Sequence, residues 1–395
     1  MDKISSFDRS NDTSESEPDT VEVSLLPESK SQIAPPRAID VFSGAGGFSL
    51  GAIQAGFEVR AAVENFGHAA ATYRKQIKNF TGRKVEFFEE DILDLSPHKV
   101  MDEGGLAPGD CDLFLGGPPC QGFSSHRLGK SGVNDPRNAL LYRYFRFLDA
   151  IRPRMFLLEN VPGLLQPKHA EYLSTFLGLA ADTGYAVREP IVLNAKDFGV
   201  PQNRKRVFIV GYDPKAVEFG IPWPPHPTHG EPGKPSERGP LMEWRTAADA
   251  FATPAPQNDP NDHHMQHRAE LIEVFRSTPV NGGSRSQSLR TLPCHEQHNG
   301  HKDVYGRIDP SKPSPTMTTA CINPSKGRFV HPTEHHGITA RQAARLQTFP
   351  DEFLFEGGLM AAGIQIGNAV PVALAKYVVT QLRSALLSPL GSKSE

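Results

Sequence analysis

The sequence predicts an α/β protein with a mostly parallel central sheet and helices on both faces of that sheet. Three observations support this fold class. Short apolar runs alternate with segments of helical periodicity, which is typical of strands buried in a parallel sheet. A glycine-rich turn follows the first apolar run, and acidic or thiol side chains follow later runs. Ligands bind beyond the carboxyl ends of strands in such sheets, so these positions are expected to form a site.

The chain has 395 residues, of which 38% are hydrophobic and 22% are charged, as in an ordinary soluble protein. This length favours a large domain joined to a smaller one. No apolar run is expected to span a membrane, and the polar N-terminus is unlike a signal peptide. The four cysteines have neither disulfide-scaffold nor zinc-ribbon spacing. We therefore expect a cytoplasmic protein with no membrane partner.

The first 35 residues form an acidic segment poor in apolar side chains, and we expect them to be a disordered tail. They carry eight acidic and three basic residues, which leaves the rest of the chain at about +2 against −3 for the whole. A nearly neutral remainder is compatible with a nucleic-acid partner, because basic groups need only line one cleft.

The first predicted strand, Ala38–Phe42, leads into a glycine-rich turn and a helix that ends at Gly56. The turn departs from a dinucleotide fingerprint because Ser49 stands where that motif has Gly or Ala. Glu64 ends the second strand, where a carboxylate can accept hydrogen bonds from a ribose diol. Both NAD and S-adenosyl-L-methionine contain that diol, so Glu64 does not distinguish them. Asp91, after the third strand at 85–88, suits a ligand contact and a helix N-cap equally.

The fourth predicted strand, 111–115, precedes the stretch from Gly116 to Ser124 that contains Cys120. Two prolines fix the backbone before the thiol, and the glycines on either side permit tight turns. Such a constrained loop packs poorly in a core and suits a positioned nucleophile. We therefore predict that Cys120 is a catalytic nucleophile rather than a buried structural cysteine.

Glu159 stands directly after the next predicted strand, Met155–Leu158. A single helix from about residue 138 joins the strands that carry Cys120 and Glu159. A right-handed crossover would place these strands side by side, so both groups would face one cleft. Further along, a helix at 169–181 and a strand at 187–193 are expected, and then Arg204 and Arg206 near the start of a strand at 207–212. Because these arginines are two residues apart, we expect both side chains to point to the same face of the strand.

From Ile221 onward, prolines interrupt the periodic pattern, and polar loops are expected as far as about residue 338. Cys294, His295, His298 and His301 gather in this region, but their spacing is not that of structural zinc sites, so we expect no metal. A short helix capped by Thr339 follows. A terminal helix is expected to start within 365–371, with an apolar stripe through Leu374, Val378, Leu382 and Leu386.

Six stretches of the sequence resemble the motifs of the DNA (cytosine-5) methyltransferases of bacterial restriction-modification systems. They follow one another along the chain in the order that the family has. The most specific is Gly117-Pro118-Pro119-Cys120-Gln121-Gly122-Phe123-Ser124. The others are Asp40–Gly47, Glu159–Val161, Gln202-x-Arg204-x-Arg206, Thr339–Gln347 and Gln365–Pro371. The resemblance covers the chain from Arg37 to Leu387, apart from the loop-rich part at about 222–338.

The resemblance implies the Rossmann-like fold of methyltransferases that use S-adenosyl-L-methionine (AdoMet), with a smaller, irregular target-recognition domain. The implied boundaries are 1–35 for the acidic tail, 36–221 and 339–388 for the two parts of the catalytic domain, 222–338 for target recognition and 389–395 for a C-terminal tail. AdoMet would be the methyl donor, S-adenosyl-L-homocysteine the product and double-stranded DNA the substrate. A cognate restriction endonuclease and a monomeric state are also expected.

The resemblance also assigns residues to roles. The catalytic residues would be Cys120, Glu159, Arg204 and Arg206. The cofactor residues would be Phe42, Ser43, Gly44, Gly46, Gly47, Glu64, Asp91, Ile92, Pro118, Asn368, Ala369 and Val370. The candidate DNA contacts, Ser124, Arg127, Arg285 and Arg307, are expected from their polar or basic side chains and not from the resemblance.

The chemistry of the residues agrees with this assignment. Carbon 5 of cytosine is a weak nucleophile, and a thiolate that adds to carbon 6 makes it an enamine. Three alternatives stay open from the sequence. The first is an RNA cytosine-5 methyltransferase of the same architecture, which a lobe of this size disfavours. The second is a nicotinamide-dependent oxidoreductase, which leaves the Pro-Pro-Cys loop unexplained, and the third is an inactive DNA-binding module.

Overall fold

The computed structural model describes residues 34–118, 139–237, 239–290 and 303–388. The described residues from Pro35 onward belong to one compact unit. Several predicted features lie outside the described residues. They are nearly all of the acidic tail, the Cys-His stretch near residue 300, and residues 119–124 of the stretch 116–124 that contains Cys120, here called the thiol loop. The predicted site residues that fall there are Cys120, Ser124 and Arg127.

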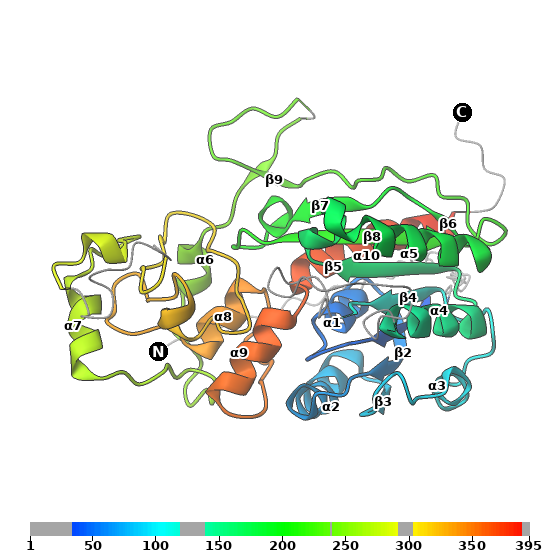
Figure 1. Cartoon of the computed structure of the whole chain (residues 1–395), viewed down its shortest axis with the longest axis horizontal. Helices are drawn as coiled ribbons and strands as arrows, with labels where there is room; N and C mark the ends of the chain where they lie inside the picture. The colour runs from blue at the N-terminus through cyan, green and yellow to red at the C-terminus, as the bar shows by residue number, and fades with distance from the viewer. Residues whose placement is uncertain (1–33, 119–138, 238, 291–302, 389–395) are drawn as a thin grey trace, which may run out of the picture. The chain divides into compact units, whose positions relative to one another are not determined.

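An eight-stranded, mostly parallel sheet forms the centre of the structure (Figure 1). Its order is β3 (Glu86–Phe88), β2 (Glu58–Val63), β1 (Arg37–Val41), β4 (Leu113–Gly116), β5 (Met155–Asn160), β8 (Lys205–Tyr212) and β6 (Ala186–Val187), with β7 (Ile191–Asn194) also on β8. The strands from β3 to β5 are parallel, whereas β8 runs antiparallel to β5. The predicted fold class is confirmed, and so is the adjacency of the two strands that precede Cys120 and Glu159.

The single strand predicted at 187–193 is wrong, because the structure has two short strands there. Both β6 and β7 pair with β8, at different ends of it. Pro190 lies between them and has no N–H to donate to the ladder, so the pairing is interrupted. The interruption changes the edge of the sheet and leaves the strands at the site unaffected.

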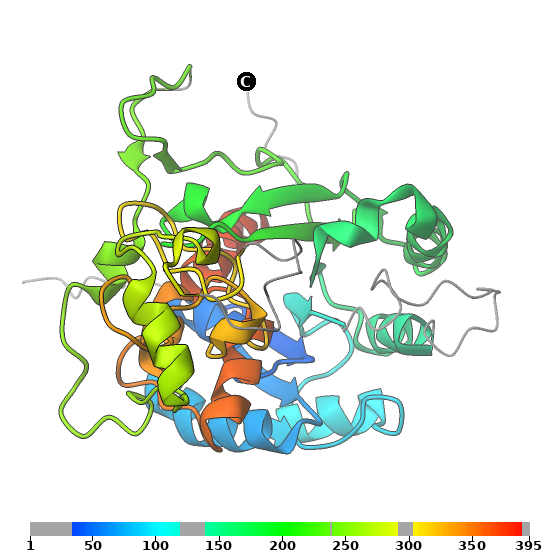
Figure 2. The same ribbon diagram turned by 60° about the vertical axis from the view of Figure 1, so that its left-hand side comes forward.

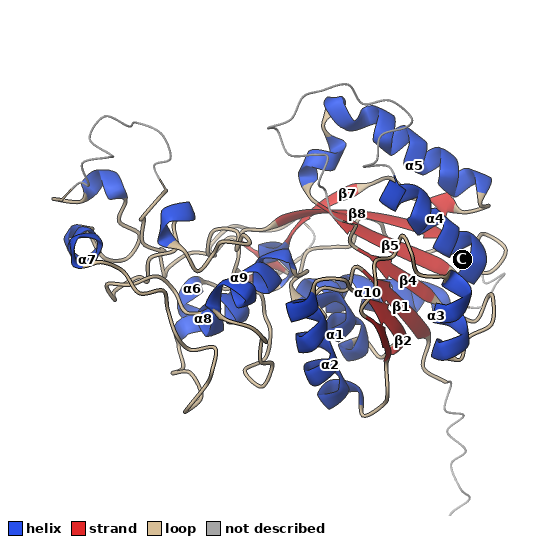
Figure 3. Ribbon diagram, turned by 60° about the horizontal axis from the view of Figure 1, so that its bottom comes forward, coloured by secondary structure: helices blue, strands red, loops and turns tan. Residues whose placement is uncertain are grey.

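Helices cover both faces of the sheet (Figure 3). On one face, Ile39 and Val41 pack in one cluster with α3 (Pro97–Gly104), α4 (Ala139–Ile151) and α5 (Ala170–Asp182). On the other face, Ala38 packs with α1 (Gly47–Gln54) and α10 (Val372–Leu387). Successive side chains of a strand point to opposite faces, so β1 supplies both cores. A third cluster joins α2 (Gly67–Thr81) to the C-terminal half of the chain.

The C-terminal region contains two helices where the sequence predicted one. α9 (Leu359–Asn368) ends before Ala369, and α10 begins after Pro371, which cannot continue a preceding helix. The apolar stretch Leu359–Leu387 has the length and composition of a membrane span, but 67% of its most apolar window is buried inside the protein. Its apolar surface is thus used in packing, as in a core helix.

The segment between β8 and the C-terminal helices consists mainly of loops (Figure 2). Its regular elements are β9 (His229–Gly230), β10 (Met242–Glu243), α6 (Ala247–Phe251) and α7 (Ala269–Ser277), and the chain returns through α8 (Ala340–Leu346). Single 3-10 turns lie at Pro162–Leu165, Pro167–His169, Ala195–Phe198, Arg285–Gln287 and Pro324–Lys326. The predicted cap of α8 is confirmed, since the Thr339 hydroxyl accepts a hydrogen bond from the Gln342 N–H.

A buried ion pair fixes the loop at 259–261 to α8. Arg341 donates to both carboxylate oxygens of Asp259, and both side chains are almost completely buried. The backbone N–H of Arg341 also donates to the Asn261 carbonyl, at 2.9 Å. Asn261 in turn exchanges two hydrogen bonds with the backbone of Phe355. This loop is therefore held by polar contacts whose side chains are shielded from water.

A buried carboxyl group lies beneath the glycine-rich turn. Asp40, on β1, accepts a 2.6 Å hydrogen bond from the Ser49 hydroxyl of α1. The same hydroxyl lies 2.7 Å from the phenol oxygen of Tyr73 on α2. Burial raises the pKa of Asp40 from 3.8 to about 7. Ser49, which departs from the dinucleotide fingerprint, therefore links three elements that surround the turn.

We expect Arg341→Leu to lower the free energy of unfolding by about 3–5 kcal/mol, because it leaves the Asp259 carboxylate buried without its partner. The double variant Arg341→Leu/Asp259→Leu should recover part of this loss. Urea denaturation measures both effects. Arg276→Leu, which breaks the surface pair with Glu273, is the control and should cost less than about 1 kcal/mol. An equal loss in the single and double variants would contradict this account.

We also expect Asp40→Asn to change the pH dependence of stability. Folding raises the pKa of Asp40 from 3.8 to about 7, so the wild type loses unfolding free energy as the pH rises between these values. Asparagine does not titrate and can still accept the Ser49 hydrogen bond. The unfolding free energy of the variant minus that of the wild type should therefore increase as the pH rises from 5 to about 7. Denaturation curves at several pH values test this, and parallel pH profiles would refute it.

Candidate functional site

The glycine-rich turn joins β1 to α1 through backbone conformations with positive φ. Phe42 has φ 58°, Gly44 has φ 56° and Gly46 has φ 99°. The N–H of Ser43 donates to the Val63 carbonyl at 3.0 Å, which fixes the turn against the end of β2. A side chain at Gly44 would meet no atom within 4 Å, so space is open beside this part of the turn.

Glu64 lies at the carboxyl end of β2 and holds the glycine-rich turn through hydrogen bonds. Its carboxylate accepts hydrogen bonds from the N–H groups of Gly44 and Phe66, both at 2.8 Å, and of Asn65 at 3.0 Å. A carboxylate offers about four acceptor positions, so one is left for a ligand. The structure therefore gives Glu64 a role in holding the turn that sequence reasoning missed.

The C-terminal residues predicted to hold the cofactor lie against this turn. A side-chain carbon at Gly47 would come within 2.5 Å of the Val370 carbonyl oxygen and 3.3 Å of the Ala369 side chain. Only glycine permits so close an approach. Asn368 is exposed at the end of α9. The structure thus brings together residues from the two ends of the chain.

Asp91 and Ile92 lie in a turn after β3. The Asp91 carboxylate accepts a 2.9 Å hydrogen bond from the Leu93 N–H. Ile92 is buried in the core on the α4 side of the sheet, and Arg143 of α4 donates to its carbonyl at 2.6 Å. No helix begins at Asp91, because α3 starts at Pro97 after Ser96, so the helix N-cap interpretation is wrong and Asp91 is an acid in a turn. A cofactor contact of Asp91 stays a prediction.

Glu159 and Arg206 form an ion pair at the carboxyl ends of the parallel strands. Arg206 Nε lies 2.9 Å from Glu159 Oε1, and the two side chains are 13% and 11% exposed. The other carboxylate oxygen would lie 3.5 Å from a side-chain carbon at Gly117. The Asn160 amide donates to the Pro118 carbonyl at 3.2 Å. The end of β5 therefore lies against the first residues of the thiol loop.

The pKa of Glu159 is raised above its ordinary value. Burial is the main cause, and the positive charges of Arg206 and Arg204 act in the opposite direction. A carboxyl group in this setting retains its proton to a higher pH than an exposed glutamate does. It can therefore donate a proton to a ring nitrogen of a ligand or share one with it.

Arg204 does not point to the same place as Arg206, so that prediction is wrong. It is fully buried, and its guanidinium donates to the carbonyls of Met317, Gly367 and Ala369. Arg204 lies before β8, which begins at Lys205, so the alternation of a regular strand does not apply to it. Arg204 fixes three backbone segments, and its charge still acts on Glu159.

Arg307 is also fully buried, which contradicts the expectation of a DNA contact. Its guanidinium donates to the carbonyls of Phe275, Thr278, His331 and Glu334. Its role is to hold α7 and the loop near residue 333 together. Arg285 is half-buried at the start of a 3-10 turn and stays a predicted DNA contact.

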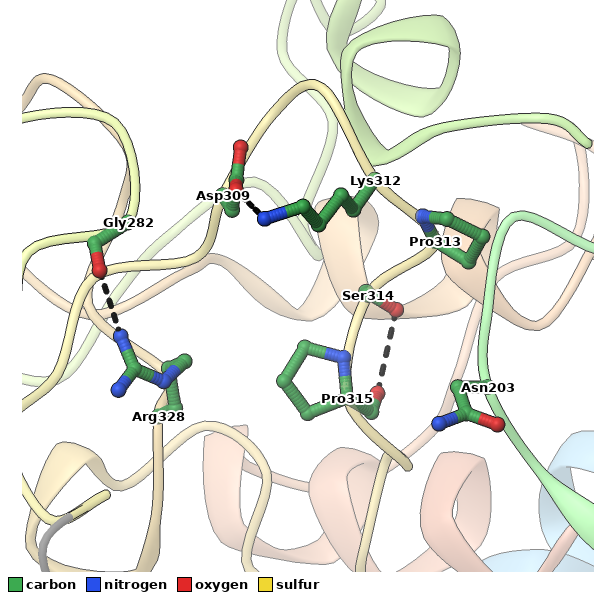
Figure 4. Close-up of a pocket in the computed structure, with 8 residues that line it drawn as sticks. All are labelled: Asn203, Gly282, Asp309, Lys312, Pro313, Ser314, Pro315 and Arg328. Atoms are coloured by element: carbon green, nitrogen blue, oxygen red, sulfur yellow. Dashed lines mark hydrogen bonds and ion pairs between the residues drawn. The ribbon is translucent and has the colours of Figure 1, made fainter. Parts of the chain in front are cut away.

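A pocket of about 350 Å³, here called the junction pocket, lies where the start of β8 meets the loop-rich segment (Figure 4). Its lining residues are Asn203, Gly282, Asp309, Lys312, Pro313, Ser314, Pro315 and Arg328. Lys312 pairs with Asp309 at 2.9 Å, and Arg328 donates to the Gly282 carbonyl at 2.9 Å. Sequence reasoning missed this pocket, because its residues come from segments with no shared pattern.

Comparison with known proteins agrees with this geometry. Residues 37–384 match the C-5 cytosine-specific DNA methylase family. The type II methyltransferase M1.HphI of Haemophilus parahaemolyticus is 33% identical over 351 residues, which cover 86% of this chain and 84% of that protein. M.NgoFVII of Neisseria gonorrhoeae is 34% identical over 350 residues, which cover 87% of this chain and 86% of that protein.

Solved structures share the fold. A prophage-encoded E. coli protein described as a DNA modification methyltransferase superposes with a TM-score of 0.62 at 26% identity, covering 89% of this chain and all of that one. The methyltransferase EhMeth of Entamoeba histolytica has a TM-score of 0.59 at 15% identity, covering 90% of this chain and 99% of that one. The match to the family extends over nearly all of the chain outside the two tails, and the chain belongs to the C-5 cytosine-specific DNA methylases.

Proposed function

We propose that this enzyme transfers a methyl group from AdoMet to carbon 5 of a cytosine in a specific double-stranded DNA sequence, through a covalent adduct between Cys120 and carbon 6. The observation that carries this proposal is the position of Glu159. A buried carboxyl group, paired with Arg206, lies beside Gly117 at the start of the thiol loop. The strand that ends there is adjacent to the strand that precedes the thiol, and the next strand bears the glycine-rich turn.

The residues around the glycine-rich turn fit AdoMet. The open space at Gly44 admits a ligand against the backbone, and the remaining acceptor position of Glu64 suits a ribose hydroxyl. Ala369 and Val370 close the turn from the other side. When bound, AdoMet supplies an electrophilic methyl group. Glu64, Gly44, Ala369 and Val370 would hold it at the glycine-rich turn.

The remaining chemistry belongs to the protein. The thiolate of Cys120 adds to carbon 6 and breaks the carbon 5–carbon 6 double bond, which moves electron density toward carbon 5. The protonated Glu159 donates a hydrogen bond or a proton to nitrogen 3 and so limits the charge on the ring. Carbon 5 takes the methyl group, and S-adenosyl-L-homocysteine is the leaving group. A base, which we take to be water, then removes the proton from carbon 5, and the Cys120 thiolate departs as the double bond re-forms. Arg206 holds Glu159 in place throughout.

A cytosine inside a duplex cannot reach this site, so we infer that the enzyme extrudes the base. Extrusion costs a few kcal/mol, which contacts to the displaced base and to the backbone offset. The loop-rich region 222–338 would serve as the target-recognition domain, with Arg285 among its contacts. Ser124 of the thiol loop and Arg127 shortly after it would contact the DNA near the target. The family description, which names a DNA methylase, favours DNA over RNA as the substrate. The names of the curated relatives are those of type II methyltransferases.

Those names also favour a type II restriction-modification system. We infer a partner endonuclease that cleaves the same recognition sequence when it is unmethylated. A monomer acting in the cytoplasm suits this task, because each site receives its methyl groups one base at a time.

We expect Cys120→Ser to lower the rate of DNA methylation by about four orders of magnitude or more, because the nucleophile is lost. AdoMet binding, measured by calorimetry, should be unchanged. The control is Cys321→Ser, which alters a buried thiol hydrogen-bonded to the Gly363 carbonyl and should retain activity. A duplex with fluorine at carbon 5 of the target should form an adduct at Cys120 that survives denaturation. Normal turnover by Cys120→Ser would end this proposal.

We expect Arg206→Met to move the alkaline limb of the methylation rate to higher pH. Arg206 lowers the pKa of Glu159, so its removal raises that pKa further and keeps the protonated form to a higher pH. The plateau rate should fall by about 10²–10³ because Glu159 loses its support. Single-turnover rates across pH give both quantities. Lys205→Met, at an exposed neighbour, is the control, and an unmoved limb would argue against a protonated Glu159.

A further inference from the structure

Three polar side chains form a cluster inside the protein where β8, α8 and the α9–α10 connection meet. They are Gln202, Arg204 and Gln347, each fully buried, and we call them the buried amide cluster. Buried polar groups of this kind are costly unless they are hydrogen-bonded. Their partners therefore indicate which backbone segments the cluster holds in place.

On one side, Gln347 holds the segment between α9 and α10. Its side-chain nitrogen donates to the carbonyls of Ile366 at 2.6 Å and Ala369 at 3.2 Å. The backbone carbonyl of Gln347 accepts a 3.1 Å hydrogen bond from the Val372 N–H. This is the segment whose Val370 carbonyl lies against Gly47 of the glycine-rich turn. One side chain thus sets the position of a segment that closes the AdoMet site.

On the other side, the cluster holds the backbone at Met317, which belongs to the loop-rich region 222–338. The Gln347 side-chain oxygen accepts from the Gln202 amide at 3.0 Å, and Gln202 in turn accepts from the Met317 N–H at 2.8 Å. Arg204 donates to the Met317 carbonyl at 2.7 Å and to the Ala369 carbonyl at 3.0 Å. Met317 and Ala369 are therefore joined through side chains of fixed length.

The segment before Met317 continues to the junction pocket. Ser314 donates from its N–H to the Pro201 carbonyl at 3.0 Å and accepts from the Asn203 N–H at 2.8 Å. The Thr316 hydroxyl donates to the Asn203 carbonyl at 2.7 Å. Asn203 and Ser314 both line the junction pocket (Figure 4). The pocket and the cluster thus contact the same two paired strands of backbone.

We infer that Gln347 is a positioning residue for AdoMet, and that the buried amide cluster makes AdoMet binding and DNA binding depend on each other. This inference rests on the proposed function. A duplex that moves or fixes the segment at 314–317 acts on Ala369 through Gln202, Arg204 and Gln347. Water cannot replace these hydrogen bonds in a buried site, so the segments move together. Such coupling is reciprocal between the two ligands.

The test compares Gln347→Met with Gln342→Ala, both in α8. Gln347→Met keeps the side-chain length and removes every side-chain hydrogen bond of Gln347. Gln342→Ala breaks the capping box of the same helix, away from the cofactor segment, and controls for loss of stability. We expect Gln347→Met to weaken AdoMet binding about tenfold, since it leaves two buried carbonyls without this donor. Gln342→Ala should leave AdoMet affinity unchanged.

The second measurement is the AdoMet dissociation constant with and without a duplex. In the wild type the two values should differ, and in Gln347→Met their ratio should move toward one. If Gln347→Met does not fold, Gln347→Glu retains the acceptor for Gln202, loses the donors to Ile366 and Ala369, and should behave in the same way. Equal AdoMet affinity in wild type and Gln347→Met would overturn the inference. Failure of the wild type to bind AdoMet or methylate DNA would instead overturn the proposed function.

Discussion

The reversed direction of β8 is the constraint on which the site depends. Five parallel strands direct their carboxyl ends to one edge of the sheet, and β8 begins at that edge because it runs antiparallel to β5. The pairing places Glu159 opposite Phe208 and brings Arg206 beside it. A parallel β8 would begin at the far edge, and the buried carboxylate would have no cation. One strand direction therefore decides whether Glu159 can exist inside the protein at a tolerable free-energy cost.

The loop-rich segment is held by arginines as well as by apolar packing. Several of its residues, among them Ile308, Met317 and Phe329, belong to the cluster with α2, and Phe275, Tyr305 and Val330 form a second, small cluster among the described residues. Arg307 and Arg328 donate to backbone carbonyls from several of its loops, which satisfies polar groups that have no ladder or helix partner. A guanidinium offers five donors in a fixed plane, and lysine cannot reproduce that pattern. Basic residues in this region therefore serve the fold as well as any DNA contact.

Local pattern predicted most of the sheet and the position of Glu159 at the carboxyl end of its strand. The strand before the glycine-rich turn, the crossover that sets β4 beside β5 and the cap of α8 all follow from short stretches of sequence and from handedness. The burial of Arg204 and Arg307 could not be predicted in this way, because their partners lie far away in sequence. Met317 and Gly367 contact Arg204 only after the chain has folded back. The prolines at 190 and 371 themselves indicated a break in regular structure. The apolar pattern on both sides of each proline nevertheless favoured a continuous element.

The packing of α1 against α10 has a consequence for synthesis of the protein. A side-chain carbon at Gly51 would come within 2.5 Å of Ala375, so these helices, from opposite ends of the chain, are in intimate contact. One face of the sheet lacks its cover until the residues of α10 have left the ribosome. The N-terminal half therefore emerges with exposed apolar surface, which stays uncovered until α10 has been synthesised. A chain cut short before α9 would lack both that cover and the segment at 369–370, so it could not form the complete site.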